Sequence, residues 1–158
     1  MKLSDFDFRI WNGKKYLKQK IYNDNINNNE YIAVTGNVDD ENYVFTIEHG
    51  CERDYYGGDY DEYCKVKDFT TCNYKIELFT GFYDKKGNKI YEGDILYYFF
   101  KNESYKFKVV FKEGAFYLIE FDDGGEECDE DLISEFLLSE MEIIGNIHEN
   151  AELLNKLS

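Results

Sequence analysis

Short segments in which apolar and polar residues alternate run along the whole chain and predict that it is built mainly of β-strands. These segments are rich in Tyr, Phe, Val and Ile, and clusters of Gly, Asn, Asp and Lys separate them, which is typical of strands joined by turns. The expected strands cover residues 6–11, 14–17, 31–35, 43–47, 94–100, 105–111, 116–121 and 142–147. Residues 132–138 fit either a short strand or one helical turn, and residues 150–157 fit a short helix with Asn150 as its N-cap.

Tight turns are predicted from residue types at fixed positions. Asn12-Gly13 fits the hairpin turn between the first two strands. Asp84-Lys85-Lys86-Gly87 fits a type I turn, because Asp at the first position bonds the backbone ahead of it and Gly at the last adopts a positive φ without strain. At the next corner Gly93 permits a sharp bend, and Asp94 is expected to bond the turn amides. Loops are expected at residues 23–29 and 37–42, and an irregular, mobile excursion from the core at residues 50–63.

The order of these elements predicts a β-rich α+β protein. The region 79–158 has up to five short strands in series, from a Gly-Asp-Ile corner to a returning strand, which indicates a small SH3-like barrel with few open edges. The region 1–78 would add hairpins or a sheet packed against that barrel. Because a Gly-rich and Asp-rich block crosses the middle of the chain, we expect one continuous structural unit rather than two tethered domains.

Composition supports this fold class and sets limits on location. The chain has 158 residues, which is long enough to bury a sizeable core, and 18% of them are aromatic, with no Pro. Tyr and Phe favour sheets. No apolar run approaches membrane-spanning length, and the first residues lack the basic and apolar regions of a signal peptide. We therefore expect a soluble cytoplasmic protein that does not bind membranes.

The charge of the chain indicates which binding partners are favoured. The formal net charge is −15, and no Lys or Arg occurs between Glu113 and Asn155. Direct binding of nucleic acid needs clusters of Lys and Arg on the phosphates, so this balance argues against it. It favours basic partners, or contacts between oppositely charged ends of two copies. Solubility alone is an alternative explanation of the charge.

Two acidic segments are candidate sites. Residues 122–131 fail the spacing of a Ca²⁺-binding loop, so a solvated acidic turn is favoured over a divalent-cation site. Residues 54–63 interleave carboxylates with tyrosines, a combination suited to protein contacts, although an exposed irregular loop is the favoured explanation. The candidate protein-binding residues are Asp54, Tyr55, Tyr56, Asp59, Tyr60, Asp61, Glu62, Glu126, Glu127, Asp129, Glu130 and Asp131.

Residues for cofactor, metal or catalytic chemistry are few. The four cysteines, Cys51, Cys64, Cys72 and Cys128, form no C-x-x-C pair. Free thiols are therefore favoured over disulfides and over a zinc site made of Cys51, Cys64, Cys72 and His49. Gly57-Gly58 is followed by Asp59 and not by a phosphate-binding Lys-Ser. Glu92 and Asp94 suit a turn better than an acid pair, no nucleophile-base arrangement is visible, and His148 is expected on the surface or in packing. We expect no cofactor, no metal and no enzymatic activity.

Four blocks carry a resemblance to a known family. They are Phe8-Arg9-Ile10-Trp11-Asn12, the stretch from Thr80 to Ile95 with T-G-x-x-D-K-x-G-x-x-I-Y-E-G-D-I, the stretch from Val109 to Leu118, and Glu142 to Leu154 with I-I-G-N-I-H-E-N-A-E-L-L. In this order they resemble the YopX family of phage-encoded and prophage-encoded proteins, with Ala151 in place of the usual Pro. The resemblance is weakest over residues 25–72, where we expect any function specific to this protein.

Three functions fit these observations. The first is a non-enzymatic phage or prophage accessory protein that assembles with itself or binds a host protein. The alternative is an inhibitor whose carboxylates imitate the phosphates of nucleic acid and block a host defence or DNA-binding protein, in the manner of anti-restriction and anti-CRISPR proteins. A cation-dependent enzyme is the third and has the least support.

Overall fold

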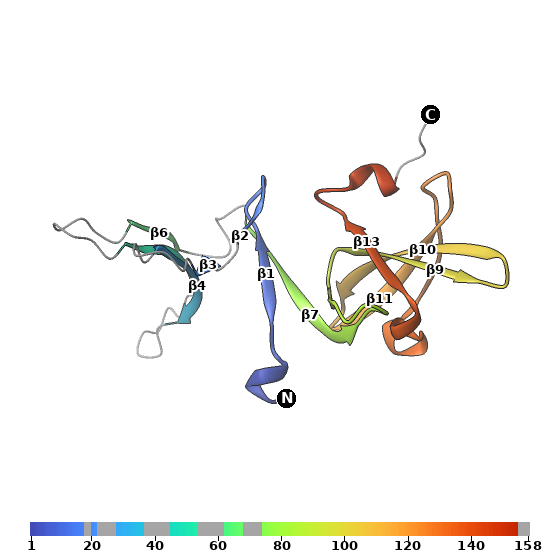
Figure 1. Cartoon of the computed structure of the whole chain (residues 1–158), viewed down its shortest axis with the longest axis horizontal. Coiled ribbons are helices and arrows are strands. Elements are labelled where there is room, and N and C mark those ends of the chain that lie inside the picture. The colour runs from blue at the N-terminus through green and yellow to red at the C-terminus, as the bar shows by residue number, and fades with distance from the viewer. Residues whose placement is uncertain (18–19, 22–27, 37–44, 54–61, 68–73, 155–158) are drawn as a thin grey trace. The chain divides into compact units, whose positions relative to one another are not determined.

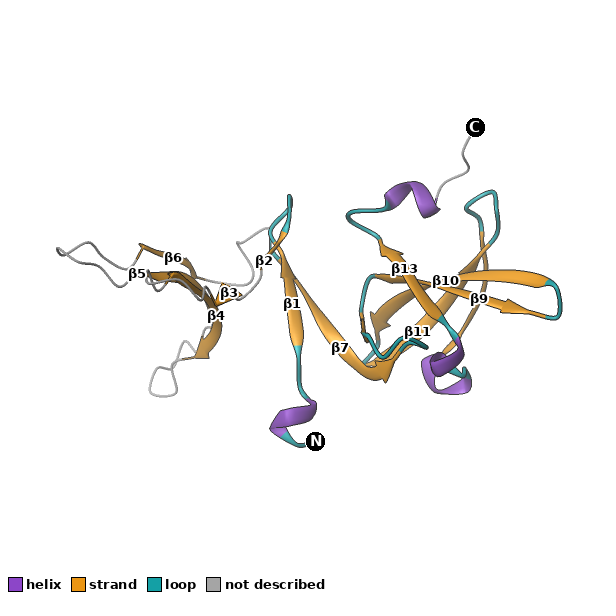
Figure 2. Cartoon of the chain, viewed as in Figure 1, coloured by secondary structure: helices purple, strands orange, loops and turns teal. Residues whose placement is uncertain are grey.

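The computed structural model confirms that the chain is mainly β (Figures 1 and 2). It describes residues 1–17, 20–21, 28–36, 45–53, 62–67 and 74–154, and for the stretches between residues 20 and 67 it describes the backbone alone. Helical structure in these residues is confined to short 3₁₀ turns. None of the helices in the described part of the chain is long and apolar enough to cross a membrane.

The chain divides into two compact units. Met1–Phe8 and Glu77–Ser158 form one, which we call the signature unit, and Arg9–Ile76 form the other, which we call the hairpin unit. The first eight residues therefore belong with the second half of the chain. The single continuous unit expected from the sequence stays a prediction.

The hairpin unit is built from antiparallel strands. Strands β1 (Phe8–Trp11) and β2 (Tyr16–Leu17) pair with Ile10 opposite Leu17. The turn between them is held by the Asn12 side chain, whose Oδ1 accepts the amides of Lys14 and Lys15 at 2.9 Å each, and the predicted hairpin is confirmed. Four further strands form a sheet in the order β3-β4-β5-β6. Their bounds are Lys20–Ile21, Asn28–Gly36, Phe45–Arg53 and Glu62–Lys67.

Part of the expected excursion at residues 50–63 is strand instead. β5 continues through Arg53 along β4, with Cys51 opposite Glu30, and β6 begins at Glu62. The prediction was wrong for these residues, because they show no alternation of apolar and polar side chains. They form strands because their backbone pairs with a neighbouring strand. Residues 54–61 and the loop expected at 37–42 lie outside the described residues.

The signature unit opens with the predicted hairpin, between β7 (Lys75–Tyr83) and β8 (Lys89–Tyr91). The Gly87 amide donates to the Asp84 carbonyl at 3.0 Å, and Gly87 has φ +80. Its turn therefore has the expected type I form with a left-handed Gly at the end.

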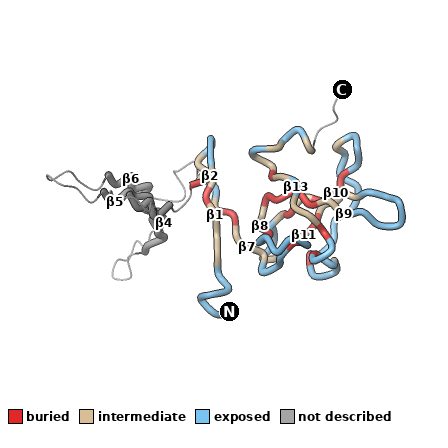
Figure 3. The backbone as a smooth tube through the Cα atoms, in the orientation of Figure 1, coloured by how far each residue is buried: buried red, intermediate tan, exposed pale blue. Residues whose placement is uncertain are grey.

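Five antiparallel strands form the main sheet of the signature unit, in the order β12-β11-β10-β9-β13. The strands β9 (Asp94–Phe100), β10 (Glu103–Lys112), β11 (Ala115–Phe121) and β13 (Glu142–Asn146) lie where the sequence predicted strands. The turn between β9 and β10 is exposed (Figure 3). Closure of this sheet into the expected SH3-like barrel stays a prediction.

The fifth strand, β12 (Glu127–Leu132), was not predicted. The sequence indicated a solvated turn there, because four of the six residues are carboxylates, and in the structure all six are exposed. The strand forms because it pairs with β11, with Asp131 opposite Leu118 and Glu130 opposite Ile119. Lys108 and Lys112 of β10 form ion pairs with Glu127 and Glu130, which offsets the repulsion between neighbouring carboxylates.

A hydrophobic core packs against one face of this sheet. It contains Ile90, Leu96, Phe107, Val109, Leu118, Ile133, Leu138 and Met141. Two 3₁₀ turns, η2 (Ile133–Glu135) and η3 (Leu138–Glu140), bring Ile133 and Leu138 into it, so the helical alternative for residues 132–138 is confirmed. The C-terminal η4 (Ala151–Leu154) is a short 3₁₀ turn, and it begins directly after Asn150, where the sequence placed the helix start.

Candidate functional site

The carboxylate of Asp84 stabilises the signature hairpin. Asp84 is 4% exposed, and its Oδ1 accepts the amides of Lys86 and Asn88 at 2.9 Å each. Its Oδ2 accepts the amide of Ile143 on β13 at 3.2 Å. Burial acts to raise the pKa of Asp84, but the amides of Asn88, Ile143 and Lys86 favour the charged form more strongly, and the pKa is lowered.

The corner at Gly93 joins three segments of the signature unit. The Gly93 amide donates to the Val109 carbonyl at 2.8 Å, and the Gly93 carbonyl accepts the Ile147 amide at 2.9 Å. Asp94, which is 2% exposed, accepts the Tyr91 amide at 2.8 Å. Asp94 and Gly93 therefore have the turn-forming contacts that the sequence indicated.

The C-terminal motif closes against this corner. Asn146 Oδ1 accepts the amides of His148 and Glu149 at 3.0 and 2.9 Å, and His148 Nε2 lies 2.7 Å from Glu77 Oε1. Glu77 is 3% exposed. His148 is thus a packing residue with a buried carboxylate beside it, and sequence reasoning missed Glu77.

A cavity of about 250 Å³ lies on the core side of the five-stranded sheet. Four strands, β9 to β12, and the segment after β12 line the cavity. The lining combines aromatic rings with three carboxylates. The lining residues are Tyr98, Phe100, Tyr105, Phe107, Leu118, Glu120, Asp129, Asp131 and Phe136.

Ring packing gives the cavity its walls. Tyr98 and Phe100 stack with centroids 5.8 Å apart and an interplanar angle of 10°, and Phe107 meets Phe136 edge-on at 5.2 Å. The hydroxyl of Tyr105 donates to Glu103 at 2.6 Å, and that of Tyr98 donates to Glu140 at 3.3 Å. These hydrogen bonds fix the two tyrosines on the sheet.

Alternation along β12, together with a register shift between Glu127 and Glu130, divides its carboxylates between the two faces of the sheet. Glu127 and Glu130 form ion pairs with lysines of β10, whereas Asp129 and Asp131 line the cavity. Glu120 of β11 joins them, and burial together with the charge of Asp129 raises its pKa. Within the described part of the chain, no Lys, Arg or His forms an ion pair with Glu120, Asp129 or Asp131.

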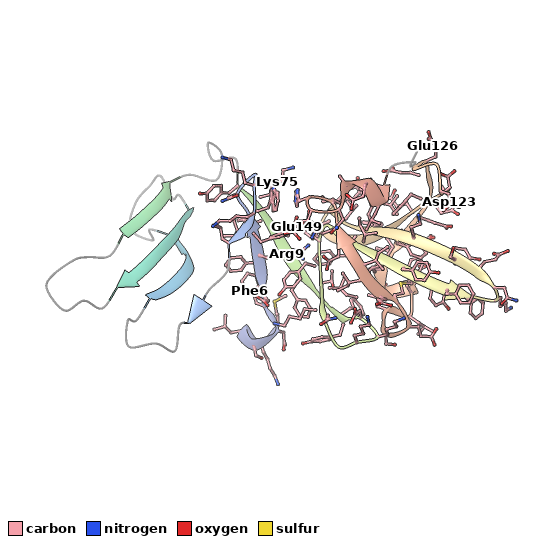
Figure 4. All side chains as sticks on the ribbon, turned by 45° about the horizontal axis from the view of Figure 1, so that its top comes forward. Phe6, Arg9, Lys75, Asp123, Glu126 and Glu149 are labelled. Atoms are coloured by element: carbon pink, nitrogen blue, oxygen red, sulfur yellow. The ribbon has the colours of Figure 1, made fainter. Side chains whose placement is uncertain are left out.

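The structure separates the candidate binding residues into three groups. Glu126 lies on the turn before β12, where Figure 4 shows it together with Asp123. Glu127 is the first residue of β12, and Glu130 lies on its outer face. Asp129 and Asp131 line the cavity. Asp54, Tyr55, Tyr56, Asp59, Tyr60 and Asp61 lie outside the described residues, and Glu62 is the first residue of β6.

Sequence reasoning missed the aromatic part of the cavity. The spacing of Tyr98 with Phe100, and of Tyr105 with Phe107, places each pair on one face of its strand. That signal was present, but only the register, with Tyr98 opposite Tyr105, shows that the two pairs share a face.

In the part of the chain that the structure describes, the acidic turns and the thiols are not arranged as metal ligands. The Asp122 carboxylate accepts the amides of Gly124 and Glu126 at 2.8 and 2.9 Å, which is the bonding of a turn, and no group of three or more His, Cys, Asp or Glu residues is placed to hold a metal. Cys128 is an exposed free thiol. In the hairpin unit the backbone register sets Cys64 opposite His49 and Glu62 opposite Cys51, and the zinc alternative there stays a prediction.

Comparison with known proteins gives a family and a structural likeness. The family model described as YopX protein matches residues 7–155. The crystal structure of protein EF1440 from Enterococcus faecalis is similar, with 25% identity and a TM-score of 0.51 over 95% of this chain and 98% of that chain. A search of curated proteins found no match.

Proposed function

The chain belongs to the YopX family, and we propose that it works by binding a basic protein through strand β12 and the turn before it. The observation that carries this proposal is that β12 is an exposed, acidic edge strand. All six residues of β12 are exposed, four of them are carboxylates, and among the described strands β12 pairs with β11 alone. Its outer backbone groups are therefore open to a partner's strand, and its side chains select for positive charge.

The same charges disfavour pairing of two copies along this edge. Charged side chains on an edge strand keep identical edges apart, because like charges would face each other across the new ladder. A basic partner removes that repulsion. We therefore favour a different, basic protein over self-assembly at β12.

Imitation of nucleic acid is the second candidate. Its support is the net charge of −15. On the outer face of the sheet, however, Lys106, Lys108 and Lys112 pair with carboxylates, so the row of negative charge is interrupted there. This arrangement supports recognition of a protein surface better than a copy of a phosphate backbone.

The proposal is a non-enzymatic one. The signature carboxylates Asp84 and Asp94 are engaged with backbone amides, which supports a structural role for the family motif. The resemblance to phage and prophage proteins makes a cytoplasmic host protein the partner that we propose.

Retention of a basic protein by the immobilised chain tests this function. A lysate of cells that encode the protein is passed over it at low and at high salt. A variant carrying E127Q, D129N, E130Q and D131N is compared with a control carrying D5N, E113Q, E135Q and E152Q, which removes the same charge from other exposed positions. We expect the native chain and the control to retain the same basic protein at low salt, and the β12 variant to lose it.

Two results would contradict the proposal. One is an equal loss of binding in the control variant, which would mean that only net charge matters. The other is retention of no basic protein together with a stable oligomer in light scattering, which would favour self-assembly.

A further inference from the structure

The cavity on the core side of the five-stranded sheet carries an inference that rests on the proposed function and specifies its chemistry. We propose that this cavity receives a cationic side chain, Lys or Arg, of the basic partner. Two of its three carboxylates, Asp129 and Asp131, lie on the same strand, β12, that we propose as the docking edge. A partner strand beside β12 would therefore have a pocket for one of its side chains close by.

The aromatic lining is the first argument. Tyr98, Phe100 and Tyr105 present rings to the cavity, and ring faces attract a cation placed within about 6 Å of the centroid. The chain already shows this behaviour at the same place, because Lys101 Nζ lies 5.1 Å from the centroid of Phe100. The apolar stem of a long cationic side chain would pack on the rings while its head remains polar.

The carboxylates are the second argument. Three of them, Glu120, Asp129 and Asp131, line one cavity, and none forms an ion pair with a basic residue of the described chain. Burial and the neighbouring charge of Asp129 raise the pKa of Glu120, so these surroundings disfavour its charged form. An entering cation would offset the repulsion between these groups.

The size of the cavity is the third argument. Its volume of about 250 Å³ is below the roughly 300–1,000 Å³ of pockets that hold drug-sized ligands or cofactors. The cavity therefore suits one side chain better than a whole metabolite. Because rings and carboxylates are combined in it, that side chain should be long and positively charged.

Titration of the full-length protein with short blocked peptides tests this inference. Amide and aromatic NMR signals are followed during addition of Gly-Lys-Gly, of Gly-Arg-Gly and of a matched peptide with norleucine, which keeps the stem and lacks the charge. We expect saturable shifts at Tyr98, Tyr105 and Leu118 with the cationic peptides and none with norleucine.

Two matched pairs of variants locate the binding. Phe100 is 47% exposed and lines the cavity, whereas its neighbour Phe99 is 59% exposed and lies on the other face of β9. D129N with D131N alters the cavity face of β12, and E113Q with E152Q removes the same charge from exposed positions outside β12. We expect F100A and the cavity-face pair each to weaken peptide binding about fivefold or more, with F99A and the control pair close to the native chain. Circular dichroism confirms that each variant is folded.

The outcomes separate this inference from the proposed function. Equal weakening by the cavity-face pair and the control pair, or equal binding of norleucine, would overturn the cavity, even where the lysate experiment still retains a basic protein. Saturable binding of the cationic peptides without a retained basic protein would support the cavity and overturn the proposed function. Stronger binding of free butylammonium than of the lysine peptide would overturn a partner's side chain as the occupant.

Discussion

Gly93 shows at the scale of one residue why the family signature needs glycine. Its φ is +85, and a Cβ added there would lie 2.8 Å from Glu77 Oε1. Glu77 in turn lies beside His148. One missing methyl group therefore lets the corner, the β7 strand and the C-terminal motif come together.

The substitution Gly93→Ala should destabilise the fold more than Gly114→Ala. Gly114 also has a positive φ, +79, but nothing lies within 4 Å of an added Cβ, so it reports backbone strain alone, roughly 1–2 kcal/mol. Gly93→Ala should lose about a further 1–3 kcal/mol from crowding. Urea denaturation measures both free energies of unfolding, and equal losses would show that Glu77 moves aside freely.

Asp84 makes stability depend on pH at the acid end. Its pKa is lowered in the folded chain, so its contribution is fully present above the pKa of the unfolded chain. The contribution is lost as the pH falls through the folded pKa. A carboxylate at this position thus stabilises the hairpin only while it is charged.

We expect Asp84→Asn to be less stable than the native chain at neutral pH and to approach it in strong acid. Leaving the bonded amides without their charged acceptor costs about 1–3 kcal/mol. Chemical denaturation from pH 7 down to pH 2 follows the difference between the two proteins. A difference that stays constant across this range would show that the charge of Asp84 is not the cause.

At the scale of the element, β12 is an acidic strand that is stabilised by lysines of β10, a strand with which it does not pair. Lys108 and Lys112 lie on β10 and reach past β11 to Glu127 and Glu130. The β11 strand gives β12 its backbone partners. Charge pairing and backbone pairing therefore come from two different neighbours.

Substituting Lys108 and Lys112 by Gln should loosen β12 more than the rest of the sheet. Without these cations the repulsion along the strand is not offset, and its amides should exchange with solvent faster. Hydrogen exchange read by NMR measures this effect, with Lys14→Gln and Lys15→Gln as the control pair on an exposed turn. High salt should reduce the difference, and unchanged exchange in β12 would show that backbone pairing alone is sufficient.

At the scale of the whole molecule, the negative charge of β12 is divided between the two faces of the sheet by alternation and by the register shift between Glu127 and Glu130. The outer carboxylates of β12 are paired with lysines, and the inner ones line an aromatic cavity. The chain has a net charge of −15, and the four carboxylates that β12 contributes to it have two different surroundings. The proposed recognition of a basic protein depends on this division, because only the inner group lacks a cation within the described chain.

The sequence by itself determined the local elements and the family. Turn residues at Asn12, Asp84, Gly87 and Gly93 and the alternation in β9, β10 and β11 act over a few neighbouring positions, so a linear pattern is enough to predict them. The fixed residues of the four motif blocks identified the YopX family for the same reason.

Only the tertiary structure decided which distant residues meet. Glu77 and His148 are 71 positions apart, and the cavity joins residues from β9 to the segment after β12. The formation of β12 itself depends on β11 and on lysines of β10, and not on its own alternation. Such contacts follow from strand order and register, which are properties of the whole sheet and leave no signal at any one position of the chain.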